Sequence, residues 1–120
     1  MQMLSPIPSR IMRTTAEVKV CTGQDRLQNQ IYRTYTVEHT HLQPTHEIRK
    51  SANNTDCTLR SILFADRRST PLDWWGLFTQ AHSIGGDMRV AVRGVEYTVF
   101  SVDELRDDTD HFHHWEIGLE

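Results

Sequence analysis

Gly86-Asp-Met-Arg-Val-Ala-Val-Arg-Gly-Val-Glu-Tyr-Thr-Val-Phe-Ser-Val102 is the stretch of this 120-residue chain that decides its fold class. Over residues 88–93 a large apolar side chain occupies every second position, which is the pattern of a strand with one buried face. Gly94 interrupts the pattern, and glycine adopts the positive φ of a tight turn without strain. The stretch therefore predicts a structural β-hairpin, entered at Gly86 and centred on Gly94 and Tyr97.

Four further runs have the composition or the alternation of β-strands. They are residues 15–21, 31–42, 57–65 and 111–119. The third run is the most apolar and predicts a central strand covered on both sides. In the second run, strict alternation would place Val37, His39 and His41 on one face. We therefore predict a mainly β fold of about six strands with mostly antiparallel pairing, forming a small barrel or sandwich.

The connections between these runs differ in length and character. Residues 47–50 add a short extended piece, and residues 51–56 form a polar loop. Residues 103–110 read as an acidic loop before the last strand, in which Trp115 is expected to be a core residue. Residues 66–86 form a connection longer than a hairpin needs, and unstructured connections of that length are usually functional.

The connection 66–86 carries the signal of a short helix at residues 71–80. Asp73 is a suitable N-cap or first-turn acid, and three apolar side chains from Trp74 onward have the i, i+3, i+4 spacing of one helix face. Adjacent side chains cannot both face the same core in most backbone conformations. Two possibilities stay open for Trp74 and Trp75: both are buried, or one is structural and the other is available to a partner.

The first residues predict an N-terminal arm. Pro6 and Pro8 block both a regular helix and a central strand, so we expect residues 1–14 to be extended. Such an arm and unpaired sheet edges are suited to exchange between neighbouring subunits. Residues 15–120 then form a single β-barrel-like domain with the insertion 66–86, and a chain of this length needs no metal or disulfide to stabilise a core.

The composition limits the class of protein. Hydrophobic residues make up 38% of the chain and the mean hydropathy is −0.54, which is polar for a self-sufficient globule and favours a component of an assembly. A net charge of −3 argues against a protein that grips nucleic acid, although it permits transient passage of DNA. The sequence has no run that approaches a membrane span and no secretory signal, so we expect a soluble protein made in a cytoplasm, without a membrane partner.

Two pairs of residues leave alternatives open. Cys21 and Cys57 are expected to be two buried free thiols, and a disulfide between them is the second possibility. Arg67 and Arg68 begin the connection 66–86, where they are solvated by default. The sharper alternative is that they contact an acidic neighbour or passing DNA.

Candidate chemical groups are present without the arrangement that catalysis needs. The best histidine cluster is His111, His113 and His114 beside an acidic residue, but alternation in a strand points His114 away from the other two. His39 and His41 supply a second pair in another strand, so zinc would need both strands and a further ligand. The sequence has no nucleophile elbow, phosphate-binding glycine loop or His-Glu-x-x-His motif. We therefore predict no enzyme, no cofactor and no metal site.

Seven short segments, taken in chain order, carry a further signal. They are 6–10 (Pro-Ile-Pro-Ser-Arg), 21–25 (Cys-Thr-Gly-Gln-Asp), 39–44, 62–66 (Ile-Leu-Phe-Ala-Asp), 69–72 (Ser-Thr-Pro-Leu), 86–99 and 113–116 (His-His-Trp-Glu). Together they resemble the tailed-phage minor capsid family of head–tail connector proteins. The similarity covers nearly the whole chain, and the ordered set is more specific than any single segment.

The resemblance implies a head-completion or stopper protein with a small β-barrel and a long inserted loop. Such proteins form a homo-oligomeric ring below the portal and its adaptor, at the head–tail junction of the virion, and can be monomers in isolation. The ring retains packaged DNA, which passes transiently through its channel, and provides the surface to which the tail attaches. They are made in the host bacterial cytoplasm.

The resemblance also implies where contacts between ring components lie. The candidate contact residues are Pro6, Ile7, Pro8, Arg10, Arg67, Arg68, Trp74 and Trp75. The arm from Pro6 to Met12 would dock on an adjacent ring component, and residues 66–86 would make inter-subunit or gating contacts. A helix with two tryptophans departs from the shorter, more acidic link of the family, which leaves open which loop gates the channel. The alternatives are a tail-terminator-like ring protein and a small metal-dependent enzyme.

Overall fold

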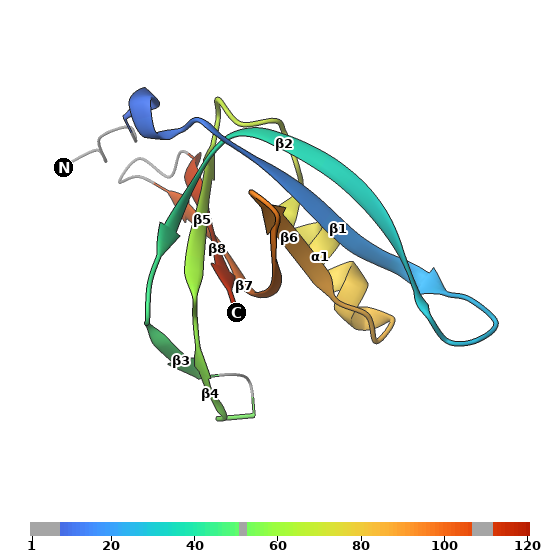
Figure 1. The fold of residues 1–120 in the computed structure, drawn as a ribbon. Coiled ribbons are helices and arrows are strands. Elements are labelled where there is room, and N and C mark those ends of the chain that lie inside the picture. The colour runs from blue at the N-terminus through green and yellow to red at the C-terminus, as the bar shows by residue number, and fades with distance from the viewer. Residues whose placement is uncertain (1–7, 51–52, 107–111) are drawn as a thin grey trace.

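Residues 8–50, 53–106 and 112–120 are described by the computed structural model of the chain. Six of the strands close into an antiparallel barrel, and two short strands form a separate sheet that projects from it (Figure 1). The elements in chain order are η1 (Ser9–Ile11, a 3-10 turn), β1 (Thr14–Gln24), β2 (Gln30–Pro44), β3 (Ile48–Lys50), β4 (Asp56–Thr58), β5 (Ser61–Asp66), α1 (Trp74–Ser83), β6 (Met88–Val92), β7 (Val95–Arg106) and β8 (Phe112–Leu119). The predicted mainly β class with antiparallel pairing is confirmed.

The barrel consists of two three-stranded halves. Its strand order is β1, β2, β5, β8, β7, β6, so β1, β2 and β5 form one half and β6, β7 and β8 form the other. The halves meet at two seams, where β1 pairs with β6 and β5 pairs with β8. Closure pairs the barrel strands in a ring, but β2 pairs with β5 only from Thr40 to Pro44, so residues 30–37 have a strand neighbour on one side only, and the unpaired sheet edge expected from the sequence is present there.

The predicted hairpin is present as β6 and β7. Its pairing runs from Arg89 opposite Thr98 to Val92 opposite Val95. Arg93 and Gly94 have φ angles of 51° and 80°, which is the combination that a two-residue type I′ turn requires. The alternation is confirmed as well, because the apolar side chains of β6 are buried and those between them are less buried.

One predicted loop and one predicted strand have different bounds in the structure. β7 continues to Arg106 and pairs with β8, so residues 103–106 are strand, not acidic loop, while 107–110 lie outside the described residues. Backbone pairing with a neighbouring strand here overrides the loop preference of acidic side chains. The single strand predicted over 57–65 is interrupted at Leu59, whose N–H donates to Glu47 O where the chain leaves the β3–β4 sheet for the barrel.

β2 contains a bulge at His39. The register steps from Thr14 opposite Thr40 to Ala16 opposite Val37, so β2 has one residue more than β1, and His39 has a φ of 58°. The extra residue reverses the alternation, and Val37 and Thr40 are both buried. The prediction that His39 shares the face of Val37 is therefore wrong, and His39 is exposed.

The connection after β5 is fastened to this bulge by two hydroxyl groups. Ser69 Oγ accepts from the Asp66 N–H at 3.0 Å and donates to His39 O at 2.5 Å. Thr70 Oγ1 accepts from the Glu38 N–H at 3.0 Å, and the Thr70 N–H donates to Glu38 O at 3.3 Å. These hydrogen bonds satisfy polar backbone groups that the bulge removes from strand pairing. They also fix the course of the connection that leads to the start of α1.

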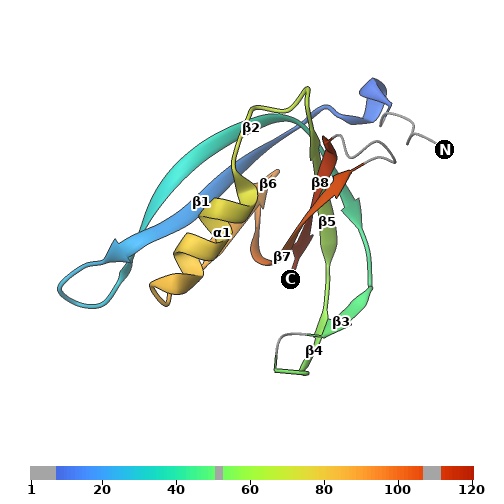
Figure 2. The ribbon, with the colours of Figure 1, turned by 180° about the vertical axis from the view of Figure 1, so that it is seen from behind.

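The predicted helix is present as α1, three residues later than the predicted start. Asp73 Oδ1 accepts from the Gly76 N–H at 3.1 Å and caps the helix as expected. A Cβ at Gly76 would lie 2.2 Å from the Asp73 carboxylate, so glycine at this position permits the cap. α1 packs against β1, β6 and β7, and Figure 2 shows it running alongside β1 and β6. Trp74 and Ala81 join the barrel core.

The N-terminal arm is described from Pro8 onward. Pro6 and Ile7 lie outside the described residues, whereas Pro8 and Arg10 are exposed. Residues 9–11 form η1 and Met12 is buried, so this part of the predicted arm is not extended. In the described part of the chain, no helix has the length and apolar character needed to cross a membrane.

Candidate functional site

The two adjacent tryptophans of α1 face opposite environments. Trp74 exposes 1% of its surface, whereas Trp75 exposes 54%. The alternative in which both indoles are buried is therefore excluded. Each tryptophan borders a different hollow of the molecule, and these two hollows are the candidate binding sites.

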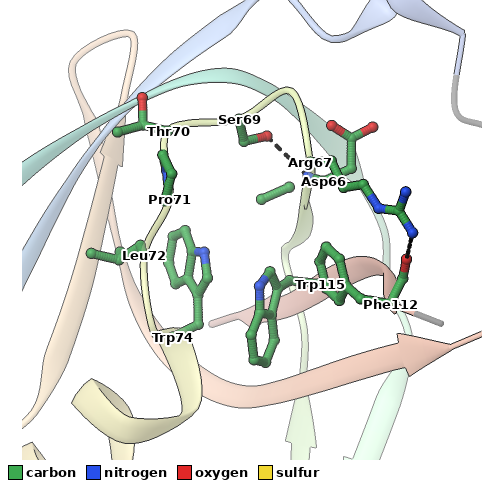
Figure 3. Close-up of a pocket in the computed structure, with 10 residues that line it drawn as sticks. Asp66, Arg67, Ser69, Thr70, Pro71, Leu72, Trp74, Phe112 and Trp115 are labelled. Carbon is green, nitrogen blue, oxygen red and sulfur yellow. Dashed lines mark hydrogen bonds between the residues drawn. The ribbon is translucent and has the colours of Figure 1, made fainter. Parts of the chain in front are cut away.

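The first hollow, here called the indole pocket, has a volume of about 210 Å³ at one end of the barrel. It is lined by Ala65, Asp66, Arg67, Ser69, Thr70, Pro71, Leu72, Trp74, Phe112 and Trp115. Figure 3 shows the indole nitrogens of Trp74 and Trp115 turned toward the space between the two side chains. Among the described residues, neither indole N–H has an acceptor. No fully buried side-chain nitrogen or oxygen of these residues lacks a partner, so the two indole nitrogens are not fully buried, and both N–H groups open onto the pocket.

The two arginines at the rim of the indole pocket are held by their own chain. Arg67 donates to Phe112 O at 3.0 Å (Figure 3). Arg68 forms an ion pair with Asp66, in which Arg68 Nε lies 3.0 Å from the carboxylate, as one of the sequence alternatives proposed. Burial raises the pKa of Asp66, but the hydrogen bonds from Arg68 outweigh it, so the net pKa lies below its ordinary value. Asp66 is thus an ionised group that is already engaged.

The second hollow, here called the helix–β7 groove, has a volume of about 520 Å³ and lies between α1 and β7. It is lined by Lys50, Trp75, Phe78, His82, Thr98, Val99, Phe100, Ser101, Val102, Asp103 and Glu120. The rings of Trp75, Phe78 and His82 form a row along α1, with centroids 6.2 Å and 4.3 Å apart. The sequence prediction named Trp74 and Trp75 as candidate contacts without deciding which of them is exposed, and it placed Phe78 on the helix face of Trp74. The i, i+3, i+7 spacing of the row is a helical signal that could have identified the other two residues.

Two of the described histidines, His41 and His114, form an aromatic row with Phe64. Phe64 stacks between His41 and His114, with centroids 5.9 Å and 5.8 Å from its own. His113 Nδ1 lies 2.6 Å from His114 Nδ1, so one ring donates to the other. His111 lies outside the described residues. Within the described ranges, no group of three or more His, Cys, Asp or Glu side chains has the geometry to hold a metal ion.

His114 predicts a pH-dependent stability. Burial lowers its pKa, as does the charge of His113, and both outweigh the opposite effect of Glu116, so the folded pKa lies below the ordinary value of 6.5. Below that value the unfolded chain binds a proton that the folded chain does not, and the free energy of unfolding falls with falling pH. We expect a decrease of up to about 1.4 kcal/mol per pH unit below 6.5 from this one group.

Denaturant unfolding between pH 7 and pH 5 measures this pH dependence. His114→Gln should flatten the profile, because glutamine does not titrate. His46→Gln is the matched control, since His46 lies exposed in the β2–β3 connection. A profile of unchanged slope in His114→Gln would contradict the assignment to His114.

Both cysteines are free thiols in the structure, but they differ in burial. Cys21 is buried beneath Gly86, where an added Cβ would lie 2.3 Å from the Cys21 sulfur, and this contact explains why glycine precedes the hairpin. Cys57 is only half-buried, and its thiol donates to Glu120 Oε2 at 2.8 Å. Burial and this hydrogen bond raise the pKa of Cys57 to about 11, so the thiol is a poor nucleophile at neutral pH.

The outer surface of β1, β6 and β7 carries charges that neutralise one another. Glu96 accepts from Lys19 at 3.0 Å and from Arg89 at 2.9 Å, and Arg89 also contacts Asp87 at 3.2 Å. Tyr32 donates to Asp87 at 2.5 Å, and burial together with this bond raises the pKa of Tyr32 to about 12. Cations paired in this way do not form a phosphate-binding patch.

The remaining predicted structural residues lie near the second seam and the hairpin. Tyr97 of β7 is covered by the Arg60 guanidinium, 4.7 Å from the ring centroid. Trp115 of β8 is partly buried against the core and also borders the indole pocket.

Comparisons with protein-family models, with curated proteins and with solved structures found no match to this chain.

Proposed function

We propose that this chain is a structural subunit of a phage head–tail junction, a connector of the head-completion or stopper type. In this role it forms a ring below the portal and adaptor, retains packaged DNA and offers the tail its attachment surface. The ordered sequence resemblance supports the proposal, and the mainly β barrel agrees with what that resemblance implies, whereas the helix with two tryptophans departs from the family's shorter, more acidic link.

The observation that carries the proposal is the exposed aromatic row of the helix–β7 groove. Trp75 exposes 54% of its surface beside Phe78 and His82, above a groove floored by β7. An indole held on a rigid helix is a frequent anchor of protein interfaces, because its large apolar area binds with little loss of conformational entropy. Most of the barrel's strand edges are paired, apart from residues 30–37 of β2, so side-chain surfaces of this kind are its main means of association.

A cyclic ring adds a further requirement that the chain can meet. Its contacts are heterologous, so each subunit must offer two different surfaces. The N-terminal arm provides one of these surfaces and the barrel of the neighbouring copy that receives it provides the other, while the groove on α1 is available to the adaptor or the tail. The net charge of −3 and the paired cations on the outer sheet suit a channel through which DNA slides without being held.

Replacing Trp75 with Ala is expected to leave a folded monomer that binds the neighbouring component of the particle, the portal adaptor or the tail, much more weakly. The affinity for the partner should fall at least about thirtyfold, the loss typical of an interface hot spot. Pull-down assays with separately purified portal-adaptor and tail-tube components measure the effect. Thr79→Ala is the matched control, because Thr79 is exposed on the same helix and its hydroxyl bonds only to α1 carbonyls.

The partner identifies the position in the particle. Capture by the portal adaptor that is lost in Trp75→Ala would support the connector, whereas capture by tail-tube components alone would favour the tail terminator. Unchanged capture of Trp75→Ala by the adaptor would overturn the role assigned to the groove.

A further inference from the structure

The indole pocket offers hydrogen-bond donors that have no acceptor. Trp74 exposes 1% of its surface, yet its indole N–H has no partner and faces the pocket, and the N–H of Trp115 does the same from the opposite wall (Figure 3). The carboxylate of Asp66 is occupied by Arg68, and the hydroxyl of Ser69 is occupied by backbone groups. A complementary ligand therefore brings acceptors and needs no acceptor from the pocket.

The indole pocket has a polar rim, lined by Asp66, Arg67, Ser69 and Thr70, and an aromatic and apolar part. Phe112 lies against Trp115 with centroids 5.8 Å apart and the ring planes tilted by 53°, and Pro71 and Leu72 lie on the same side of the pocket as Trp74 (Figure 3). Aromatic-lined pockets of this kind bind extended proline-containing segments, whose rings pack on the indole faces. Proline has no N–H, so such a segment presents carbonyl oxygens as acceptors without adding donors.

One segment of the chain has this chemistry. Residues 5–8 have the sequence Ser-Pro-Ile-Pro. A residue that precedes proline is restricted to extended conformations, so few backbone conformations are available to Ser5 and Ile7. The other two prolines are already used, since Pro44 belongs to β2 and Pro71 lines the indole pocket itself.

We propose that the indole pocket binds the Pro6–Pro8 segment of a second copy of the chain. A proline ring packs between Trp74 and Trp115, and the carbonyls of Ser5 and Ile7 accept from the two indole N–H groups. The assignment of the arm to a neighbouring copy rests on the proposed function, because the copies are neighbours in the proposed ring. It makes the arm and the pocket the two complementary halves of a heterologous contact.

The indole N–H signals in ¹H–¹⁵N spectra of the full-length chain test this proposal. The receptor carries Pro6→Ala and Pro8→Ala, so its own arm does not compete, and the probe is a peptide of residues 3–12. The signals of Trp74 and Trp115 should move saturably, while that of Trp75 stays in place, because it lies outside the indole pocket. A peptide with both prolines replaced by Ala should bind about tenfold more weakly.

Conservative variants separate hydrogen bonding from packing. Trp115→Phe keeps an aromatic wall and removes one donor, so the peptide affinity should fall about threefold to tenfold. Trp75→Phe is the matched control and should leave the peptide affinity unchanged. Both variants also assign the three indole signals.

Several results would overturn the proposal. These are the absence of shifts of the pocket signals at millimolar peptide, and equal shifts with both peptides. In the chain with its natural prolines, pocket signals at the bound position at every protein concentration would mean that each arm occupies its own pocket, which overturns the second-copy assignment. The peptide titration does not depend on phage components, so its failure and the failure of the adaptor pull-down are distinguishable.

Discussion

The free energy of unfolding is expected to fall by about 3–5 kcal/mol when Trp74 is replaced by Ala. Trp74 is among the largest fully buried side chains and belongs to the same core cluster as Val18, Val90 and Ile117. Its removal would take away the largest buried side chain that α1 packs into the barrel and join the vacated volume to the indole pocket, which admits water. Urea unfolding followed by far-ultraviolet circular dichroism measures the loss.

The neighbouring residue supplies the control for this prediction. Trp75→Ala removes the same side chain from the next position of the same helix, but 54% of that side chain is already exposed. We expect a loss of less than about 1 kcal/mol. Equal losses in the two variants would contradict the opposite burial of the pair.

The second large effect is expected at Ser69. Replacing Ser69 with Ala should lower the free energy of unfolding by about 2–3 kcal/mol, because the Asp66 N–H and the His39 carbonyl both lose their partner. Ser69 exposes only 5% of its surface, so water replaces the hydroxyl poorly. The same urea experiment measures the loss, and amide hydrogen exchange should show faster exchange at Asp66 in particular.

Thr70→Val is the matched control for the Ser69 prediction. Thr70 also bonds the bulge through its hydroxyl, but it is exposed, so water can take over the Glu38 N–H and the loss should stay below about 1 kcal/mol. If Ser69→Ala were as stable as the unsubstituted chain, the bulge would not depend on this hydroxyl.

Local features of the fold could be predicted from the sequence, whereas features set by distant contacts could not. The β6–β7 hairpin depends on alternation and on Gly94, and both are visible within a few residues. The bulge at His39 is different, because its carbonyl is satisfied by Ser69, thirty residues away. A strictly alternating reading of β2 therefore went wrong at the residue where a distant segment supplies a hydrogen bond.

The candidate sites follow the same division. That Trp74 and Trp75 cannot face one core was visible from their adjacency, and the row along the helix–β7 groove was accessible from helical spacing. The indole pocket was not accessible, because Trp74 meets Trp115 only when the last strand pairs with β5 and the helix packs on the barrel. No spacing within the sequence encodes that meeting.

The division of the barrel into two halves bears on how the chain is made. β1, β2 and β5 leave the ribosome before β6 to β8 do, and until those strands emerge both outer strands of the first half have unpaired backbone groups. The two seams join strands far apart in the chain, so their closure carries a high loop entropy and is expected to be slow among small domains, in milliseconds to seconds. During this interval the nascent sheet can pair with other chains, and completion of the barrel removes that risk at the two seams.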